Sequence, residues 1–214
     1  MALRFINDNG LFRLFGDNTA ELIELSPRLL TDIPGGVFVL GGNDTVTGST
    51  ISELILGNDG QDSISGGEGN DSLFGGKGND QLFGDAGDDF LSGDRDIDTL
   101  TGGQGSDTFA LSTGGGLDII TDFDNTTDFI QVPANLNIGD ILIQTAGANT
   151  LLTVKSTGEQ LAQLNNVQAS SITTANLLAN QPPLQSTPIP RPDTPVFLPP
   201  DFSFPDSPLS PILL

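Results

Sequence analysis

Acidic side chains stand at every ninth position through the middle of the chain. The set comprises Asp44, Glu53, Asp62, Asp71, Asp80, Asp89, Asp98 and Asp107. Calcium is a hard cation that takes about six to eight oxygen ligands, which regularly spaced carboxylates and neighbouring backbone carbonyls supply. Glycine-rich turns precede the acids, and glycine adopts the left-handed backbone conformations that tight loops need. The spacing therefore predicts an array of calcium sites.

The acids belong to eight consecutive nonapeptides that fill residues 39–110 without a gap. An apolar residue follows each acid by two positions, and glycine occupies the fourth position in six of the eight repeats. The apolar residues are Val46, Ile55, Ile64, Leu73, Leu82, Leu91, Leu100 and Phe109. This pattern predicts a turn followed by a short strand whose eighth-position side chain faces a core. A disordered Gly-rich segment would not place an apolar residue at every eighth position.

The repeat G-G-x-G-x-D-x-U-x resembles the RTX (hemolysin-type) calcium-binding repeat of secreted bacterial proteins. The resemblance implies an all-β fold, a right-handed parallel β-roll. In such a roll two nonapeptides make one turn, repeat i lies beside repeat i+2, and calcium sits between them. One edge would carry Asp44, Asp62, Asp80 and Asp98, and the other would carry Glu53, Asp71, Asp89 and Asp107. Without metal these stacked carboxylates repel, so we predict that the roll folds on calcium binding.

The resemblance also implies the ligand sets. Full sites are expected at Asp44/Asp62, Asp62/Asp80, Asp80/Asp98, Asp71/Asp89 and Asp89/Asp107, with a last site at Asp98/Asp118. Carbonyl ligands in the family come from positions two and four of one repeat and positions one and three of its partner. The implied sets are Gly42 with Gly57 and Asp59; Asn58 and Gly60 with Gly75 and Lys77; Gly67 and Gly69 with Gly84 and Ala86; Gly76 and Gly78 with Gly93 and Arg95; and Asp85 and Gly87 with Gly102 and Gln104.

Two repeats depart from the pattern. The repeat of Glu53 has Ser49 and Ile51 where the loop favours glycine, and its acid is one methylene longer, so a site at Glu53/Asp71 is in doubt. Asp96 replaces glycine at position four of another repeat, a milder change because Asp tolerates the left-handed region better than branched residues. About six Ca²⁺ ions would offset roughly half of the net charge.

The composition of the chain argues against several classes of function. The 214 residues include 28 Asp and Glu against 7 Lys and Arg, a formal net charge of −21. This acidity disfavours nucleic acids, whose phosphates need basic side chains, and anionic membranes. The chain has no His and no Cys, which excludes zinc triads, Ser-His-Asp triads, thiol chemistry and disulfides. No nucleophile elbow occurs either, so we predict that the chain is not an enzyme.

Four segments are expected along the chain. Residues 1–36 form an N-terminal cap, with a hairpin around Asn7–Gly10 and then either a helix from Asn18 to Pro27 or a strand from Glu21 to Leu25. Residues 37–121 form the roll, with Gly35-Gly36-Val37 as a degenerate half-turn and Asp118 in a restarted repeat. Two alternatives are open for the acids that follow, a further ion site or a solvated acidic turn, and they concern Asp122, Asp124 and Asp128. Residues 122–180 form a β-rich cap, with a hairpin from Asp140 to Val154, a strand from Glu159 to Asn165 and a short helix from Ser170 to Ala179. Residues 181–214 carry 11 of the 14 prolines and form a flexible tail.

The two outer faces differ. Leu54, Leu56, Phe74 and Phe90 predict an apolar patch on one of them. A terminal segment is expected to cover it, with self-association as the alternative.

The N-terminus lacks the apolar region of a secretory signal peptide, and no run approaches the roughly 18 apolar residues of a membrane span. The resemblance therefore implies type I secretion, with the Pro-rich tail as a candidate signal.

Three functions remain open at this stage. The first is a secreted calcium-binding protein with a structural, matrix or adhesive role, in contact with the cell surface, extracellular matrix or its own copies. The second is a stand-alone RTX module that assists secretion or folding of a separate enzyme. An ice-binding β-roll ranks last, because charged residues interrupt position three of the repeats.

Overall fold

Two facing nine-stranded sheets make up almost the whole of the described chain. The computed structural model describes residues 4–8, 11–16, 18–25 and 36–179. The first sheet contains β1 (Arg4–Asp8), β2 (Leu11–Phe15), β4 (Val37–Phe38), β6 (Leu54–Asp59), β8 (Ser72–Lys77), β10 (Phe90–Arg95), β12 (Thr108–Ala110), β14 (Phe129–Gln131) and β18 (Leu177–Leu178), in that order. The second contains β3 (Leu22–Glu24), β5 (Thr45–Ser49), β7 (Ser63–Glu68), β9 (Gln81–Ala86), β11 (Thr99–Gln104), β13 (Asp118–Ile120), β17 (Gln160–Leu164), β16 (Asn149–Val154) and β15 (Ile141–Ala146).

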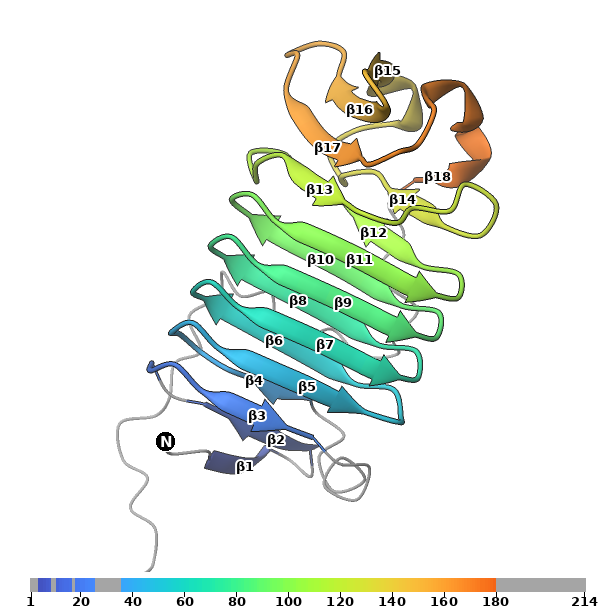
Figure 1. The fold of residues 1–214 in the computed structure, drawn as a ribbon. Coiled ribbons are helices and arrows are strands. Elements are labelled where there is room, and N and C mark those ends of the chain that lie inside the picture. The colour runs from blue at the N-terminus through green and yellow to red at the C-terminus, as the bar shows by residue number, and fades with distance from the viewer. Residues whose placement is uncertain (1–3, 9–10, 17, 26–35, 180–214) are drawn as a thin grey trace, which may run out of the picture.

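Consecutive repeats alternate between the sheets, so each strand lies beside the strand two repeats later. Ile64 in β7 aligns with Leu82 in β9, and Leu73 in β8 aligns with Leu91 in β10, both in parallel pairs. Figure 1 shows the resulting elongated stack, with β1–β3 at one end and β15–β17 at the other. The predicted parallel β-roll, with repeat i beside repeat i+2, is confirmed.

The core is a single column of side chains between the two sheets. All eight apolar residues at repeat position eight are buried, with exposed fractions of 0–1%. Phe109 closes the array by packing against Phe123, with ring centroids 6.0 Å apart. Burial of each such side chain contributes roughly 1.5–3 kcal/mol. The inward prediction for position eight is therefore confirmed at every repeat.

The N-terminal end extends both sheets. Strands β1 and β2 form the predicted antiparallel hairpin, and β2 then pairs in parallel with β4. Val37 in β4 aligns with Ile55, as expected for a degenerate half-turn. The segment after Asn18 contains the strand β3, which pairs with β5, so the helix alternative was wrong. The short polar loop before β3 leaves too little room for a helix once the strand joins the sheet edge.

The C-terminal end mixes parallel and antiparallel pairing. The restarted repeat forms β13 beside β11, and the predicted hairpin is β15 with β16. Strands β17 and β18 then return to pair in parallel with β13 and β14. The helix predicted from Ser170 to Ala179 was wrong: two 3-10 turns, Ala169–Ser171 and Thr174–Asn176, precede β18. Parallel pairing here overrides the weak helical preference of a segment rich in Ser and Thr.

The apolar residues of the outer face lie on the first sheet. Leu54 and Leu56 are on β6, Phe74 is on β8, and Phe90 is on β10. The rings of Phe74 and Phe90 lie 5.6 Å apart between centroids, and Leu56 is buried. The predicted Pro-rich tail, residues 181–214, lies outside the described residues. Within the described ranges, no helix is long and apolar enough to cross a membrane.

Candidate calcium-binding edges

The acids of the repeats lie in two rows, one along each edge of the roll. Strands run from position seven of one repeat to position three of the next, so the turns consist of positions four to six. The acid at position six ends each turn and is buried in every repeat. Stacking of turns 18 residues apart therefore places the acids directly above one another, as the rows required.

Each aspartate of the rows uses one oxygen to hold the preceding turn. The amide of Asp62 donates to Oδ1 of Asp80 at 2.8 Å, and the amide of Asp71 donates to Oδ1 of Asp89 at 2.7 Å. The same bond joins Asp44 to Asp62, Glu53 to Asp71, Asp80 to Asp98 and Asp89 to Asp107, at 2.7–2.9 Å. The final bond of the first row, from Asp98 to Asp118, lengthens to 3.3 Å. These acids therefore link neighbouring turns of the roll through hydrogen bonds.

The second oxygen of six carboxylates is buried and accepts no hydrogen bond. These atoms are Oδ2 of Asp62, Asp71, Asp80, Asp89, Asp98 and Asp107. A buried charged oxygen without a partner is costly, and native proteins pair such groups with donors or metal ions. The repetition of the same orphan atom along both edges indicates that a cationic partner belongs there.

Glycine at position one forms a cradle beside each of these oxygens. A β-carbon on Gly75 would overlap Oδ2 of Asp80 and lie 2.9 Å from the carbonyl oxygen of Gly93. A β-carbon on Gly66 would likewise overlap Oδ2 of Asp71, 2.9 Å from the carbonyl oxygen of Gly84. The carboxylate oxygen and a carbonyl from the next stacked turn thus share one small space. Hard oxygen donors converging in this way fit calcium.

Carbonyl ligands were predicted at positions two and four of one repeat and at positions one and three of its partner, and those of position three lie on the same edges. Position four donates its N–H to the position-three carbonyl of the next stacked turn, as from Gly60 to Lys77 at 2.8 Å and from Gly42 to Asp59 at 2.9 Å. The pairs Gly69 to Ala86 and Gly87 to Gln104 are equivalent. A carbonyl oxygen has two lone pairs, so each of these acceptors retains capacity for a metal.

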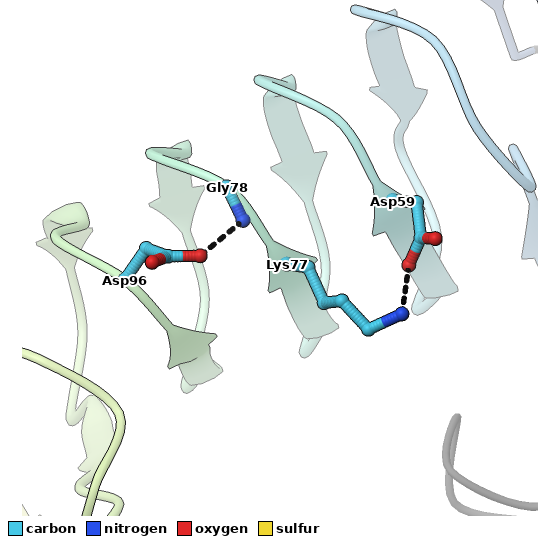
Figure 2. A network of polar contacts seen from close by, with 4 residues as sticks. All are labelled: Asp59, Lys77, Gly78 and Asp96. Carbon is cyan, nitrogen blue, oxygen red and sulfur yellow. Dashed lines mark hydrogen bonds and ion pairs between the residues drawn. The ribbon is translucent and has the colours of Figure 1, made fainter.

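The repeat of Asp96 keeps the same backbone path. Asp96 adopts a left-handed φ of 74°, as its tolerance for that region predicted. The N–H of Gly78 donates to Oδ2 of Asp96 at 3.1 Å, and on the adjoining strands Lys77 reaches Asp59 at 2.8 Å (Figure 2). Both side chains of this ion pair are more than half exposed, so the pair adds at most about 1 kcal/mol.

Burial raises the pKa of the row carboxylates. The pKa rises to about 8 for Asp80, to about 7 for Asp107 and to about 6 for Asp89, with desolvation as the largest cause in each. The pKa of Asp71, Asp98 and Asp118 rises for the same reason, and neighbouring carboxylates raise it further. The negative charge of these buried carboxylates is therefore unfavourable unless a proton or a bound cation neutralises it.

The acids after the array do not form an additional cluster. Asp122 accepts the N–H groups of Gly102 and Gly103 at 3.0 and 2.9 Å, and Asp128 accepts that of Asp124 at 2.9 Å. Within the described part of the chain, no three acids converge on one metal position. The extra ion considered for Asp122, Asp124 and Asp128 is therefore not supported, and backbone amides satisfy these carboxylates. Each site along the rows would combine carboxylates with carbonyls.

A ninth nonapeptide escaped the sequence analysis. Residues 16–24 have Gly16 at position one, Glu21 at position six and Ile23 at position eight. The amide of Glu21 donates to Oδ1 of Asp44 at 2.8 Å, which extends the first row by one turn. The acid and the apolar residue carry the signal, but the fourteen residues that separate it from the contiguous repeats and the absence of glycine at position four conceal it.

A second ladder runs beside the acids at position five. The amide of Ile97 donates to Oδ1 of Asn79 at 3.1 Å, and the amide of Asp88 donates to Oδ1 of Asn70 at 3.1 Å. These side chains accept from the turn that follows, whereas the acids accept from the turn that precedes. The sequence signal for this ladder is Asn at position five in three repeats, at Asn43, Asn70 and Asn79.

Comparison with known proteins agrees with this geometry. Residues 56–91 and 83–120 match the family of the RTX calcium-binding nonapeptide repeat in its four-copy form. This part of the chain consists of RTX repeats, and repeats of this family bind calcium. No curated protein shows significant sequence similarity to the chain.

Several solved structures are similar. The R3 subunit of mannuronan C5-epimerase AlgE6 from Azotobacter vinelandii is 23% identical, over 91% of this chain and 94% of that subunit, with a TM-score of 0.42. The R2 subunit of the same enzyme is 26% identical, over 67% and 94%, with a TM-score of 0.31. Extracellular lipase LipA from Serratia marcescens is 16% identical, over 72% of this chain and 42% of the lipase, with a TM-score of 0.35.

Proposed function

We propose, from the RTX calcium-binding repeats that this chain carries over residues 56–120, that it is a secreted protein whose roll folds when calcium binds. Its role is structural, in a matrix or in adhesion, and it has no catalytic activity. One observation carries the proposal: six buried carboxylate oxygens along two edges have no hydrogen-bond donor. Calcium would supply the positive charge that these oxygens lack.

The proposed sites lie between stacked turns. The carboxylate pairs are Asp44/Asp62, Asp62/Asp80, Asp80/Asp98 and Asp98/Asp118 on one edge, and Asp71/Asp89 and Asp89/Asp107 on the other, for about six ions. Position-one glycines leave room for the ion, and the carbonyls of positions one to four complete the shell. The proposed ligands therefore come from two turns at every site, so that bound metal holds successive turns together.

The arrangement explains why folding would depend on metal. The chain carries a net charge of −21, and the rows concentrate that charge at buried positions. A preformed site does not exist in the unfolded chain, so the free energy of calcium binding contributes directly to folding. Extracellular calcium modules bind at roughly 0.1–1 mM. Such a roll stays unfolded where calcium is scarce and folds after export.

The remaining segments would protect and present the roll. In this proposal residues 1–36 and 122–180 cap its two ends. The apolar residues of the first sheet (Leu54, Leu56, Phe74 and Phe90) would meet a terminal segment, a second copy or an extracellular surface. An adhesive or matrix role follows from a stiff, acidic rod that forms only outside the cell.

Small-angle X-ray scattering in chelator and in calcium tests the proposal. We expect a radius of gyration of roughly 50 Å without metal, as for an unfolded chain of this length, and a much smaller value with calcium. Magnesium at the same concentration should not produce the compact form, because it demands octahedral geometry and retains its waters. A compact roll in chelator, with no change on adding calcium, would refute metal-driven folding.

A further inference from the structure

Glu53 differs from every aspartate in its row. The amide of Ser49 donates to Oε2 of Glu53 at 3.2 Å, and the hydroxyl of Ser49 donates to Oε1. Both carboxylate oxygens therefore have donors from one residue, Ser49, the last residue of β5. By contrast, Asp71, Asp89 and Asp107 each leave Oδ2 buried without a donor.

The glycine at position one of this repeat is as crowded as its equivalents. A β-carbon on Gly48 would overlap the carbonyl oxygen of Gly66 and lie 2.9 Å from Oε2 of Glu53. The feature that sets Glu53 apart is therefore its pair of hydrogen bonds from Ser49, which the aspartates lack.

The other end of this row has a similar arrangement. Asp128 accepts the amide of Asp107 at Oδ1 (3.1 Å) and the amide of Asp124 at Oδ2 (2.9 Å). The hydroxyl of Thr127 also donates to Oδ1 at 3.1 Å. Asp128 is buried, and backbone and hydroxyl donors satisfy both of its oxygens.

We propose that protein donors take the place of calcium at both ends of this row, Ser49 at Glu53 and the Asp124 amide with Thr127 at Asp128. Calcium then enters the row only through Asp71, Asp89 and Asp107. The inference rests on the proposed function, because it concerns which acids of the same array take metal. Its physical basis is that a buried carboxylate oxygen needs a cation or a hydrogen-bond donor, and both oxygens of each end acid have donors.

The row therefore ends, on both sides, in an acid whose two oxygens accept hydrogen bonds from the chain. Hydrogen-bond donors of the chain itself satisfy both oxygens of its terminal acids, so neither acid leaves an oxygen that requires an ion. The turn of Glu53 would hold its local hydrogen bonds at calcium concentrations too low to fill the central sites.

The test counts ions per chain by equilibrium dialysis and elemental analysis, at the free calcium concentration that just saturates the unaltered protein. Glu53→Gln keeps the size of the side chain and one acceptor, and it should bind as many ions as the unaltered protein. Asp89→Asn, the matched variant in the middle of the row, should bind at least one fewer. Far-UV circular dichroism in calcium verifies that both variants are folded.

A variant that should gain a calcium site tests the same inference in the opposite direction. The triple substitution Ser49→Gly, Ile51→Gly and Glu53→Asp restores the repeat pattern and should add one ion per chain. Failure to gain an ion, or loss of an ion in Glu53→Gln alongside the loss in Asp89→Asn, would overturn the inference alone. If Asp89→Asn loses no ion, the proposed calcium sites are wrong and the inference falls with them.

Discussion

The backbone amide of Asp62 donates to Oδ1 of Asp80 at 2.8 Å, while Oδ2 of Asp80 is buried without a donor. One carboxylate thus has two roles: it accepts a hydrogen bond from the preceding turn, and it is a proposed ligand for metal. The two roles belong to different oxygens, so substitutions can separate them. Asparagine retains the oxygen that accepts the hydrogen bond but not the charged oxygen, and alanine removes both.

Asp80→Asn should therefore weaken calcium binding more than it weakens the calcium-saturated fold. Interactions of charged groups contribute roughly 1.5–3 kcal/mol, so the calcium midpoint should rise by about tenfold or more. Asp80→Ala should shift the midpoint further and also lower the free energy of unfolding in saturating calcium. Calorimetric titration and urea denaturation measure the two quantities.

Asp88→Asn is the matched control for loss of charge. Asp88 is exposed at position five and accepts the amide of Ser106 at 2.9 Å, a role that asparagine keeps. Its calcium midpoint should stay within about twofold of the unaltered protein, since screening weakens exposed charges. An equal shift in Asp88→Asn and Asp80→Asn would show that net charge, and not ligation, governs binding.

Gly75→Ala should block the site beside it. The added methyl group would overlap Oδ2 of Asp80 and crowd the carbonyl of Gly93. Overpacking of this kind typically costs about 1–3 kcal/mol, and here it also displaces a ligand. Gly139→Ala has open space around the new methyl group and should change stability by less than about 0.5 kcal/mol. Thermal unfolding in calcium compares them, and equal melting temperatures would contradict the cradle.

Metal-free protein should be more ordered in acid than at neutral pH. Burial raises the pKa of Asp80 to about 8 and that of Asp107 to about 7, against an ordinary value of 3.8. The folded form therefore binds more protons than the unfolded chain between about pH 4 and pH 8. Its stability is fully present below pH 4 and is lost as pH rises through the folded-state pKa values.

Two measurements examine this linkage. In chelator, β-structure seen by circular dichroism should increase from pH 8 to pH 5. At pH 7, calcium binding should release protons, which calorimetry detects as a heat that depends on the ionisation enthalpy of the buffer. A metal-free fold that strengthens as pH rises would contradict the proposed lack of charge compensation.

The position-five ladder should stabilise the roll without affecting calcium binding. Asn79→Ala removes the acceptor for the amide of Ile97 and should lower the free energy of unfolding by roughly 0.5–1.5 kcal/mol. Asn79→Asp keeps the acceptor and should resemble the unaltered protein. Both variants should bind the usual number of ions; a lost ion in Asn79→Ala would place this ladder in the metal sites.

The contiguous repeats made the central fold predictable. A strict period of nine fixes which residues stack, and Leu82 or Leu91 at position eight can only face inward once the acids lie at the turns. Asp96 was also anticipated, because its tolerance for a left-handed backbone follows from its side chain alone. These features depend on local sequence and on one repeated register.

Features that depend on contacts between distant segments were missed. A strand over Glu21–Leu25 was one of two alternatives, but its place in the roll was not predicted, because Glu21 lies 23 residues before Asp44 and not 18. The helix predicted after Ser170 failed because β18 pairs with β14, and the paired residues, such as Ile130 and Leu177, lie 47 positions apart in the chain. The Ser49–Glu53 pairing was hidden because sequence shows a departure from the motif but not what replaces it.

A calcium titration followed by far-UV circular dichroism, with magnesium as the control, tests whether calcium drives folding of the roll. Calcium should produce a cooperative change from coil to β-structure, and magnesium should produce none. A spectrum that is already rich in β-structure in excess chelator, and that calcium leaves unchanged, would contradict calcium-driven folding. The orphan carboxylate oxygens would then be compensated by protons, and the apolar core and the ladders alone would hold the roll.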